Sequence, residues 1–374
     1  YLVDRVLPML PERLSNDLCS LRPNVDRLAF SALFVFNKNN KIINRWFGKT
    51  VIHSDQRFTY ADAQERIEGK GGSFAQEVQQ LAKIARYLRK QRYKEGAINF
   101  ETEEVKFRLD KDAVPVEVYV KERKEAHMMI EDFMLLANRE VAQFISLKGR
   151  DQEIPYVYRI HDEPDPDKVA ELSRFAREMG FDMNISSPEQ VAKAYNRLAK
   201  EVKKRPELRL LSPLAIRTMS KAAYSTENIG HYGLGFEYYT HFTSPIRRYS
   251  DVLSHRLLEP NLSHNDFYRI NKSRLEDQCA HVSKKERNAI TAERESIKYK
   301  QVEYIEKHIG EEFDGFINGM MDRGFFVELE AGLIEGGSFV TNDKTLDVKQ
   351  TACIACGDPE CVWTISKKLI QIDP

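Results

Sequence analysis

The sequence has no excess of charge of either sign and no long apolar run. Its 57 lysine and arginine residues balance 57 aspartate and glutamate residues, so the formal net charge over 374 residues is zero. A globally basic nucleic-acid binder is therefore excluded, and contact with a nucleic acid has to come from a local basic surface. No stretch approaches the roughly 20 apolar residues that a membrane helix needs, so we expect no membrane partner.

Cysteine is also scarce, with 5 residues in the whole chain. An odd and sparse set does not suit a disulfide framework, which favours a reducing, cytoplasmic setting. The chain begins at Tyr1 without methionine or a secretory signal, so we expect a trimmed or incomplete polypeptide. The remaining composition, 42% hydrophobic and 30% charged, is that of a soluble globular protein.

The residue pattern predicts an α+β protein. The β-prone stretch 27–36 and the extended stretch 42–54 predict two strands joined by a polar turn. Apolar residues at helical spacing predict helices that start after the cap Ser73, near residue 127, at Asp165 followed by Pro166, and at the cap Ser187 followed by Pro188, and a long charged helix over 275–309. Beyond Gly310 short alternating strands with glycines at bends are typical of a small β-barrel, so we place a domain boundary there.

The stretch HFTSPIRRY at 241–249 carries the most chemistry. We expect Ser244 to cap a helix with Pro245 in its first turn, which places Arg247 beside free backbone N–H groups and the positive end of the helix dipole. A helix N-terminus with a guanidinium group can bind phosphate, and the aromatic residues before it can stack on unpaired bases. The alternative is a capped helix whose arginines pair with carboxylates and whose aromatics fill a core.

Further segments accompany this stretch in order: PMLPE at 8–12 with LSN and CSL soon after, INFE at 98–101, AH at 126–127 with IE and AN following, and YRIHD at 158–162. Together with Asp251 and His255-Arg256 they resemble the ribonuclease II / ribonuclease R family of 3′-to-5′ exoribonucleases, over roughly residues 1 to 335. The resemblance implies a ribonuclease II-type catalytic domain over 1–309, with a mixed sheet flanked by helices. The start of an OB-type RNA-binding barrel would follow over 310–337.

The resemblance also implies an activity: hydrolysis of single-stranded RNA from its 3′ end to nucleoside 5′-monophosphates in a Mg²⁺-dependent site, by a monomer. The family's metal-binding aspartates lie before the position of Tyr1, so we expect the Mg²⁺ ligands upstream of this chain and no metal ligands within it. The acidic run at 162–167 is interpreted as a loop and a helix cap. Without the aspartates, the alternative function is a non-catalytic protein that binds single-stranded RNA.

The family's site residues carry over onto six positions. Arg247 would contact the scissile phosphate, with Arg248 as the alternative, and Glu293 would lie near the active site. Tyr1 would stack on the 3′-terminal nucleotides. Two residues, Tyr60 and Glu131, would recognise the sugar, because the 2′-hydroxyl both donates and accepts hydrogen bonds.

Each of these assignments has a plain structural alternative. Tyr1 can be a frayed terminal residue, and the two glutamates can be solvated positions on charged helices. The basic runs at 86–94 and 200–205 can contact RNA or, as is commoner, form solvated helix faces.

In the predicted barrel, Phe316 and Phe325 can offer a stacking platform or fill the core. Residues 338–374 no longer follow the family and weakly resemble the tail of small-molecule-binding domains of the 4-vinyl-reductase type. Three cysteines there, Cys353, Cys356 and Cys361, can supply part of a zinc site or be unpaired thiols. A small-molecule- or zinc-sensing fusion is therefore a further functional alternative.

Overall fold

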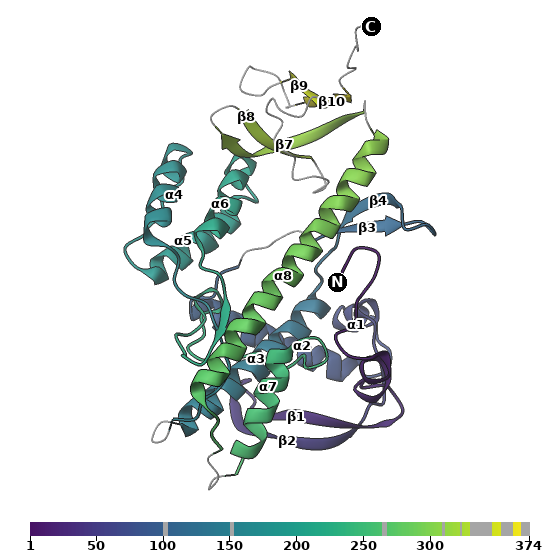
Figure 1. Ribbon diagram of the computed structural model, residues 1–374, viewed down its shortest axis with the longest axis vertical. Coiled ribbons are helices and arrows are strands. Elements are labelled where there is room, and N and C mark those ends of the chain that lie inside the picture. Colours follow the sequence, from purple (N-terminus) through teal and green to yellow (C-terminus); the bar gives the residue numbers. More distant parts are fainter. Residues whose placement is uncertain are drawn as a thin grey trace.

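The computed structural model describes residues 1–99, 104–149, 153–263, 268–308, 311–321, 324–329, 346–352 and 362–367. For the strands beyond residue 311 the description covers the backbone. One helix, α8 (Lys272–Ile305), crosses the molecule diagonally from a lower layer of helices and a hairpin to the upper strands β7–β10 (Figure 1). The predicted long helix is confirmed, and it connects both ends of the structure.

The hairpin of β1 (Asp26–Phe36) and β2 (Ile42–His53) closes the lower layer (Figure 1). The two strands pair antiparallel, as the sequence predicts, and alternation turns Phe30, Phe34 and Phe47 to one face. This face packs against α3 (Glu125–Lys148), α7 (Tyr249–Leu258) and the first turns of α8. The main core is therefore built from segments that are distant in the sequence.

Two helices pack beside this core. α1 (Tyr60–Ile67) begins with a capping box in which Thr59 and Asp62 satisfy each other's backbone N–H groups. α2 (Ala75–Lys94) begins after Phe74, in the left-handed conformation, rather than after the predicted cap Ser73. α2 lies against α3, so that residues from both helices share a small apolar cluster: Val78, Ala82, Ala85 and Met129.

A second core lies within α4 (Pro166–Glu178), α5 (Pro188–Glu201) and α6 (Leu211–Thr218). Asp165 and Ser187 cap the first two helices, each followed by proline at the first helical position, as the sequence predicts. The largest fully buried side chain here is Tyr195, whose hydroxyl bonds to Thr218.

The remaining strands do not form the predicted mixed sheet. In the described part of residues 1–309, β3 (Val105–Leu109) pairs only with β4 (Pro115–Val120), and β5 (Tyr158–Ile160) only with β6 (Ala223–Ser225). All of these pairs are antiparallel, and β5 and β6 have three residues each, too few to recruit further strands. This part of the fold expectation is wrong, because helices rather than neighbouring strands cover each pair.

The upper strands, β7 (Glu312–Met321), β8 (Gly324–Leu329), β9 (Leu346–Ala352) and β10 (Val362–Lys367), form a sheet in the order β8-β7-β10-β9. Phe316 and Phe325 lie on the backbone of β7 and β8, and Cys353, Cys356 and Cys361 lie outside the described residues. Short helical turns complete the chain: η1 (Arg13–Leu18), η2 (Pro206–Leu210), η3 (Tyr232–Leu234), η4 (Glu259–Asn261) and η5 (Glu306–His308).

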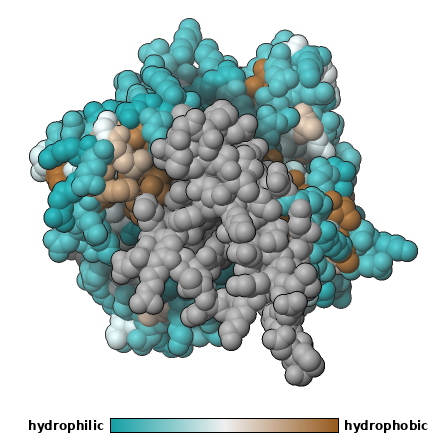
Figure 2. Space-filling view, turned by 90° about the horizontal axis from the view of Figure 1, so that it is seen from above, coloured by the Kyte–Doolittle hydropathy of each residue, from teal (hydrophilic) through white to brown (hydrophobic). Residues whose placement is uncertain are grey.

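The described residues on the face seen from above are mainly polar (Figure 2). From above, the described residues visible in Figure 2 are largely hydrophilic, and hydrophobic residues form a few small groups. No helix among the described residues has both the length and the apolar character to cross a membrane.

The buried side-chain amide of Asn138 connects α3 to residues 239–242, at the start of the HFTSPIRRY stretch. Asn138 of α3 donates from Nδ2 to the Tyr239 hydroxyl (3.1 Å) and accepts the backbone N–H of Phe242 at Oδ1 (2.9 Å). All three residues are buried, so neither partner can turn to water instead.

We therefore expect Asn138→Ala to lower the free energy of unfolding by about 2–4 kcal/mol, because it leaves two buried groups unpaired. Urea unfolding measures this loss. The matched control Asn44→Ala, on the exposed face of β2, should change stability by less than about 0.5 kcal/mol. Equal losses in the two variants would contradict the assignment.

Candidate functional site

Three arginines surround the imidazole of His241. Arg159 comes from β5, and Arg247 and Arg248 come from the segment before α7. Burial, together with the neighbouring positive charges of Arg248 and Arg159, lowers the pKa of His241 to about 2. His241 is therefore neutral, and the positive charge of this arginine cluster resides on the guanidinium groups.

The segment 244–248 is a tight turn and not the start of a helix. The backbone N–H groups of Arg247 and Arg248 both donate to the carbonyl of Ser244 (3.3 and 3.1 Å), and α7 begins only at Tyr249. Ser244 does not cap α7, so the predicted helix start is wrong by several residues. Proline at 245 favours such a turn as readily as a first helical turn.

The carboxylate of Asp251 explains why the helix starts later. Its Oδ1 accepts the backbone N–H of Ser244 (2.7 Å) and Nη2 of Arg248 (2.9 Å), and its Oδ2 accepts the Ser250 hydroxyl (3.1 Å). Asp251 is fully buried, in the first turn of α7, where its charge already complements the positive end of the helix. The helix terminus next to Arg247 therefore already carries a buried negative charge.

The three arginines differ in whether a carboxylate neutralises their charge. Nη2 of Arg248 bonds to Asp251, and Nη1 of Arg159 forms an ion pair with Oε2 of Glu286 at 2.6 Å. Arg247 is exposed, and within the described residues its guanidinium has neither an ion pair nor a hydrogen bond. Arg247 is thus the guanidinium of the cluster with charge and donors available for an anion.

One face of α8 connects this cluster to the first residues of the chain. Glu286 and Glu293 are seven residues apart, which places them on the same face about 10 Å apart along the axis. Ser296, one turn further, accepts the backbone N–H of Val3 (3.1 Å) at its hydroxyl. Glu293, which is partly buried, therefore lies along α8 between the arginine cluster and the segment that carries Tyr1. The Tyr1 side chain is 66% exposed and accessible for stacking.

Tyr60 and Glu131 meet through His127, to which the sequence analysis assigned no role in the site. The ring of Tyr60 stacks on His127 with a centroid distance of 4.0 Å and an angle of 15°. Glu131 lies one turn after His127 on α3, where it forms ion pairs with Arg123 and, at 3.7 Å, with Arg92. Tyr60 and Glu131 thus share one surface, and Glu131 is ion-paired rather than merely solvated.

His127 contributes a defined hydrogen-bond donor to this surface. Its Nδ1 accepts the backbone N–H of Lys124 (3.3 Å), and burial together with the nearby charges of Lys121 and Arg123 lowers its pKa. A neutral imidazole that accepts at Nδ1 carries its proton at Nε2. His127 could have been assigned to this surface from the sequence, because it lies four residues before Glu131 and therefore on the same face of an amphipathic helix.

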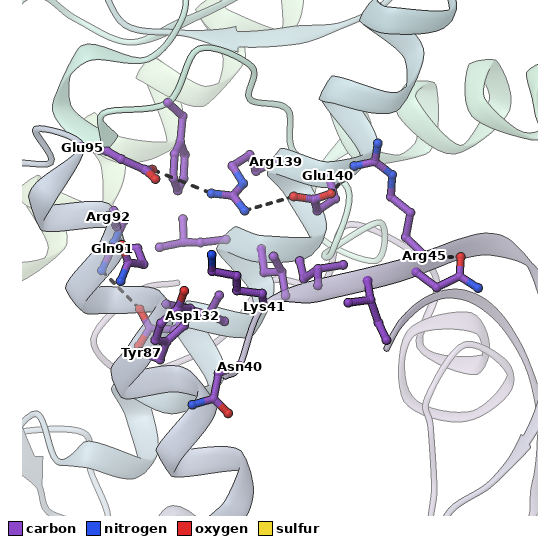
Figure 3. A pocket seen from close by; sticks show the side chains of 17 residues that line it. Asn40, Lys41, Arg45, Tyr87, Gln91, Arg92, Glu95, Asp132, Arg139 and Glu140 are labelled. Atoms are coloured by element: carbon purple, nitrogen blue, oxygen red, sulfur yellow. Dashed lines mark hydrogen bonds and ion pairs between the residues drawn. The ribbon is translucent and has the colours of Figure 1, made fainter. Parts of the chain in front are cut away.

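A cavity of about 640 Å³ lies on the other side of α3, between α2 and the start of β2 (Figure 3). Each arginine that lines this cavity forms an ion pair with a carboxylate. Arg45 pairs with Glu140, Arg139 with Glu140 (3.0 Å) and Glu95 (3.9 Å), and Arg92 with Asp132 (3.3 Å). This cavity therefore attracts an anion less than Arg247 does.

The cavity also decides the interpretation of the basic run at 86–94. Arg89 and Arg92 both bind the buried carboxylate of Asp132, and their side chains are 17% and 10% exposed. The interpretation of this run as a solvated helix face is wrong for these two residues, because carboxylates of α3 neutralise them across the interface between the two helices.

The described residues contain no group of three or more His, Cys, Asp or Glu side chains placed to hold a metal ion. In the acidic run at 162–167, Asp165 accepts the backbone N–H groups of Asp167 (3.1 Å) and Lys168 (3.4 Å) as the cap of α4, as predicted. The carboxylates of the described residues therefore do not form a Mg²⁺ site.

Comparison with known proteins finds similar sequences and structures. A model of the RNB domain matches residues 1–264. Ribonuclease R of Aquifex aeolicus is 39% identical over 344 residues, covering 90% of this chain and 48% of that protein. Ribonuclease R 2 of Lactococcus lactis is 36% identical over 387 residues, covering 99% of this chain and 57% of that protein. The second match necessarily includes most of residues 338–374.

Solved structures agree. The structure of Mycoplasma genitalium RNase R in complex with ribose methylated single-stranded RNA superposes with a TM-score of 0.79 at 30% identity. It matches 87% of this chain and 52% of that chain. The chain spans about half the length of the curated relatives it matches.

Two histidines with strongly lowered pKa values, His231 and His241, make stability depend on pH. Burial lowers the pKa of His231 to about 3 and that of His241 to about 2, whereas each takes up a proton near pH 6.5 once unfolded. The unfolded state therefore binds more protons below pH 6.5. The free energy of unfolding should fall by about 1.4 kcal/mol per pH unit for each histidine once the pH is below 6.

Urea unfolding between pH 7 and pH 5 measures this slope. His241→Gln should flatten it by one histidine's contribution, whereas His281→Gln, at an exposed position, should leave it unchanged. Parallel slopes in all three proteins would show that His241 titrates normally in the folded state.

Proposed function

The chain belongs to the RNB-domain family of the ribonuclease II and ribonuclease R type, and on this premise we propose that it acts on single-stranded RNA from the 3′ end and releases nucleoside 5′-monophosphates. The observation that carries this proposal is the uncompensated guanidinium of Arg247, held in the 244–248 turn beside two arginines that are already paired. Hydrolysis of a phosphodiester builds negative charge on the phosphoryl oxygens, and a fixed guanidinium stabilises it.

The same geometry assigns different roles to the two neighbouring arginines. Arg248 is held by the buried carboxylate of Asp251, so that it orients the turn. Arg247 is free to contact the scissile phosphate with two parallel donors. We therefore propose Arg247, and not Arg248, as the phosphate-binding residue.

Recognition of the sugar falls to the surface of Tyr60, His127 and Glu131. A tyrosine hydroxyl and a carboxylate suit the 2′-hydroxyl, which donates and accepts, and their combination distinguishes RNA from DNA. Tyr1 stacks on the terminal bases, and Glu293 lies between it and the arginine cluster along α8. The Mycoplasma genitalium protein bound to ribose methylated single-stranded RNA supports RNA as the ligand class.

The remaining expectations are part of the same proposal. Mg²⁺ is the expected cofactor, with aspartate ligands that the described residues do not supply, and β7 and β8 are the start of an OB-type RNA-binding barrel. The protein acts as a cytoplasmic monomer. The non-catalytic alternative is a chain that binds RNA through Arg247 and the sugar surface without cleaving it.

The first test uses the 374-residue chain with 5′-labelled single-stranded RNA, with Mg²⁺ or with EDTA. Binding should weaken steeply as salt rises, because phosphate contacts release counterions. A descending ladder of products that EDTA abolishes supports the enzyme, and binding without shortening supports the non-catalytic alternative. Salt-independent binding, or none, would overturn the proposed function.

The second test separates the two arginines in the full-length protein. Arg247→Ala should lower kcat by about 100-fold or more and change RNA affinity by less than about threefold, because its donors act on charge that develops in the transition state. Arg248→Ala should instead lower the melting temperature, because it leaves Asp251 as an unpaired buried charge. Equal losses of affinity and turnover in Arg247→Ala would show a binding residue only.

A further inference from the structure

Arg159 is enclosed by two partners that no role described above requires. Its guanidinium pairs with Glu286 of α8 at 2.6 Å and lies over the ring of Tyr224, with its carbon 4.6 Å from the ring centroid. The side chain is only 12% exposed. Arg159 and Tyr224 are also directly opposite in the β5–β6 pair, so the strand register itself places the ring beneath the cation.

Tyr224 continues the contact toward the site. Its hydroxyl shares a hydrogen bond of 2.7 Å with Nδ1 of His241, and its backbone N–H donates to the hydroxyl of Ser283 on α8 (2.9 Å). Burial raises the pKa of Tyr224 to about 12, so the phenol keeps its proton throughout the physiological range. A continuous path of direct contacts therefore runs from Glu286 through Arg159 and Tyr224 to His241.

His241 lies just before the turn that presents Arg247. After the turn, Asp251 fixes Ser244 and Arg248 through its buried carboxylate. Before the turn, the side chain of His241 is held by its hydrogen bond to the Tyr224 hydroxyl. The turn is thus held from both ends, from α7 on one side and from α8 on the other.

Stability alone gives no account of this path. Taking a guanidinium and a carboxylate out of water costs desolvation energy, and apolar residues of similar volume often stabilise a fold as well or better. What the ion pair supplies is a fixed direction, because a guanidinium over an aromatic ring and against a carboxylate has little rotational freedom. A fixed direction matters where a second guanidinium has to meet a reacting phosphate.

We propose that Glu286, Arg159, Tyr224 and His241 form a positioning network that sets the orientation of Arg247 relative to α8. The proposal rests on the proposed function, since it assigns a purpose to the placement of Arg247. None of the four residues needs to touch RNA. A displacement of about 1 Å in a catalytic group is enough to lower turnover by up to about 100-fold.

The test uses Tyr224→Phe in the full-length protein, because phenylalanine keeps the ring under Arg159 and removes only the hydroxyl that binds His241. We expect kcat on single-stranded RNA to fall about tenfold, with KM within about twofold of the wild-type value. The matched control is Tyr195→Phe, which removes a buried hydroxyl bound to Thr218 in the separate α4–α6 core. Its kcat should equal that of the wild type.

A double-mutant cycle with Arg247→Lys shows whether the effect passes through Arg247. Lysine carries its charge on a flexible stem and depends less on the orientation of the turn. In that background Tyr224→Phe should lower kcat by about twofold or less, a non-additive result.

Two outcomes would overturn the network. The first is an unchanged kcat in Tyr224→Phe. The second is the same tenfold loss of kcat from Tyr224→Phe with and without Arg247→Lys, which would show that Tyr224 acts independently of Arg247. A wild-type protein that does not shorten RNA would instead remove the proposed function, and the network with it. The wild-type assay comes before any variant is made, so failure of the proposed function is distinguishable from failure of the network.

Discussion

The buried carboxylate of Asp251 is the group on which the geometry of the site depends. It accepts hydrogen bonds from a backbone N–H, a hydroxyl and a guanidinium, and it does so without solvent exposure. A buried anion is tolerable only when its acceptor capacity is used in this way. Because the carboxylate consumes the charge of Arg248 and the positive end of α7, the adjacent Arg247 is left as the available cation.

This arrangement resolves how a chain with no net charge can present a site for a polyanion. Acidic residues are interspersed with basic ones, and each arginine that lines the cavity beside α2 and α3 has a carboxylate partner. The net potential at a given position then reflects which arginine lacks a partner. Local imbalance, and not overall composition, determines where a phosphate can bind.

Much of the fold was accessible from the sequence. The hairpin, the caps at Asp165 and Ser187 and the long helix follow from local patterns, since alternation, capping residues and helical spacing are local properties. The start of α7 was not accessible. Whether SPIRR forms a first helical turn or a preceding turn is decided by the side chain of Asp251, which reaches back seven residues to Ser244. Likewise, the position of Arg159 within a short apolar strand signals a buried ion pair, but its partner Glu286 is 127 residues away.

The contact between Val3 and Ser296 joins residues that are 293 positions apart. During synthesis the first residues emerge early, yet the helix that receives them is translated only near the end of this stretch of chain. Loop closure over such a separation is slow compared with the formation of local helices. The segment that carries Tyr1 and Val3 therefore docks on α8 late in folding.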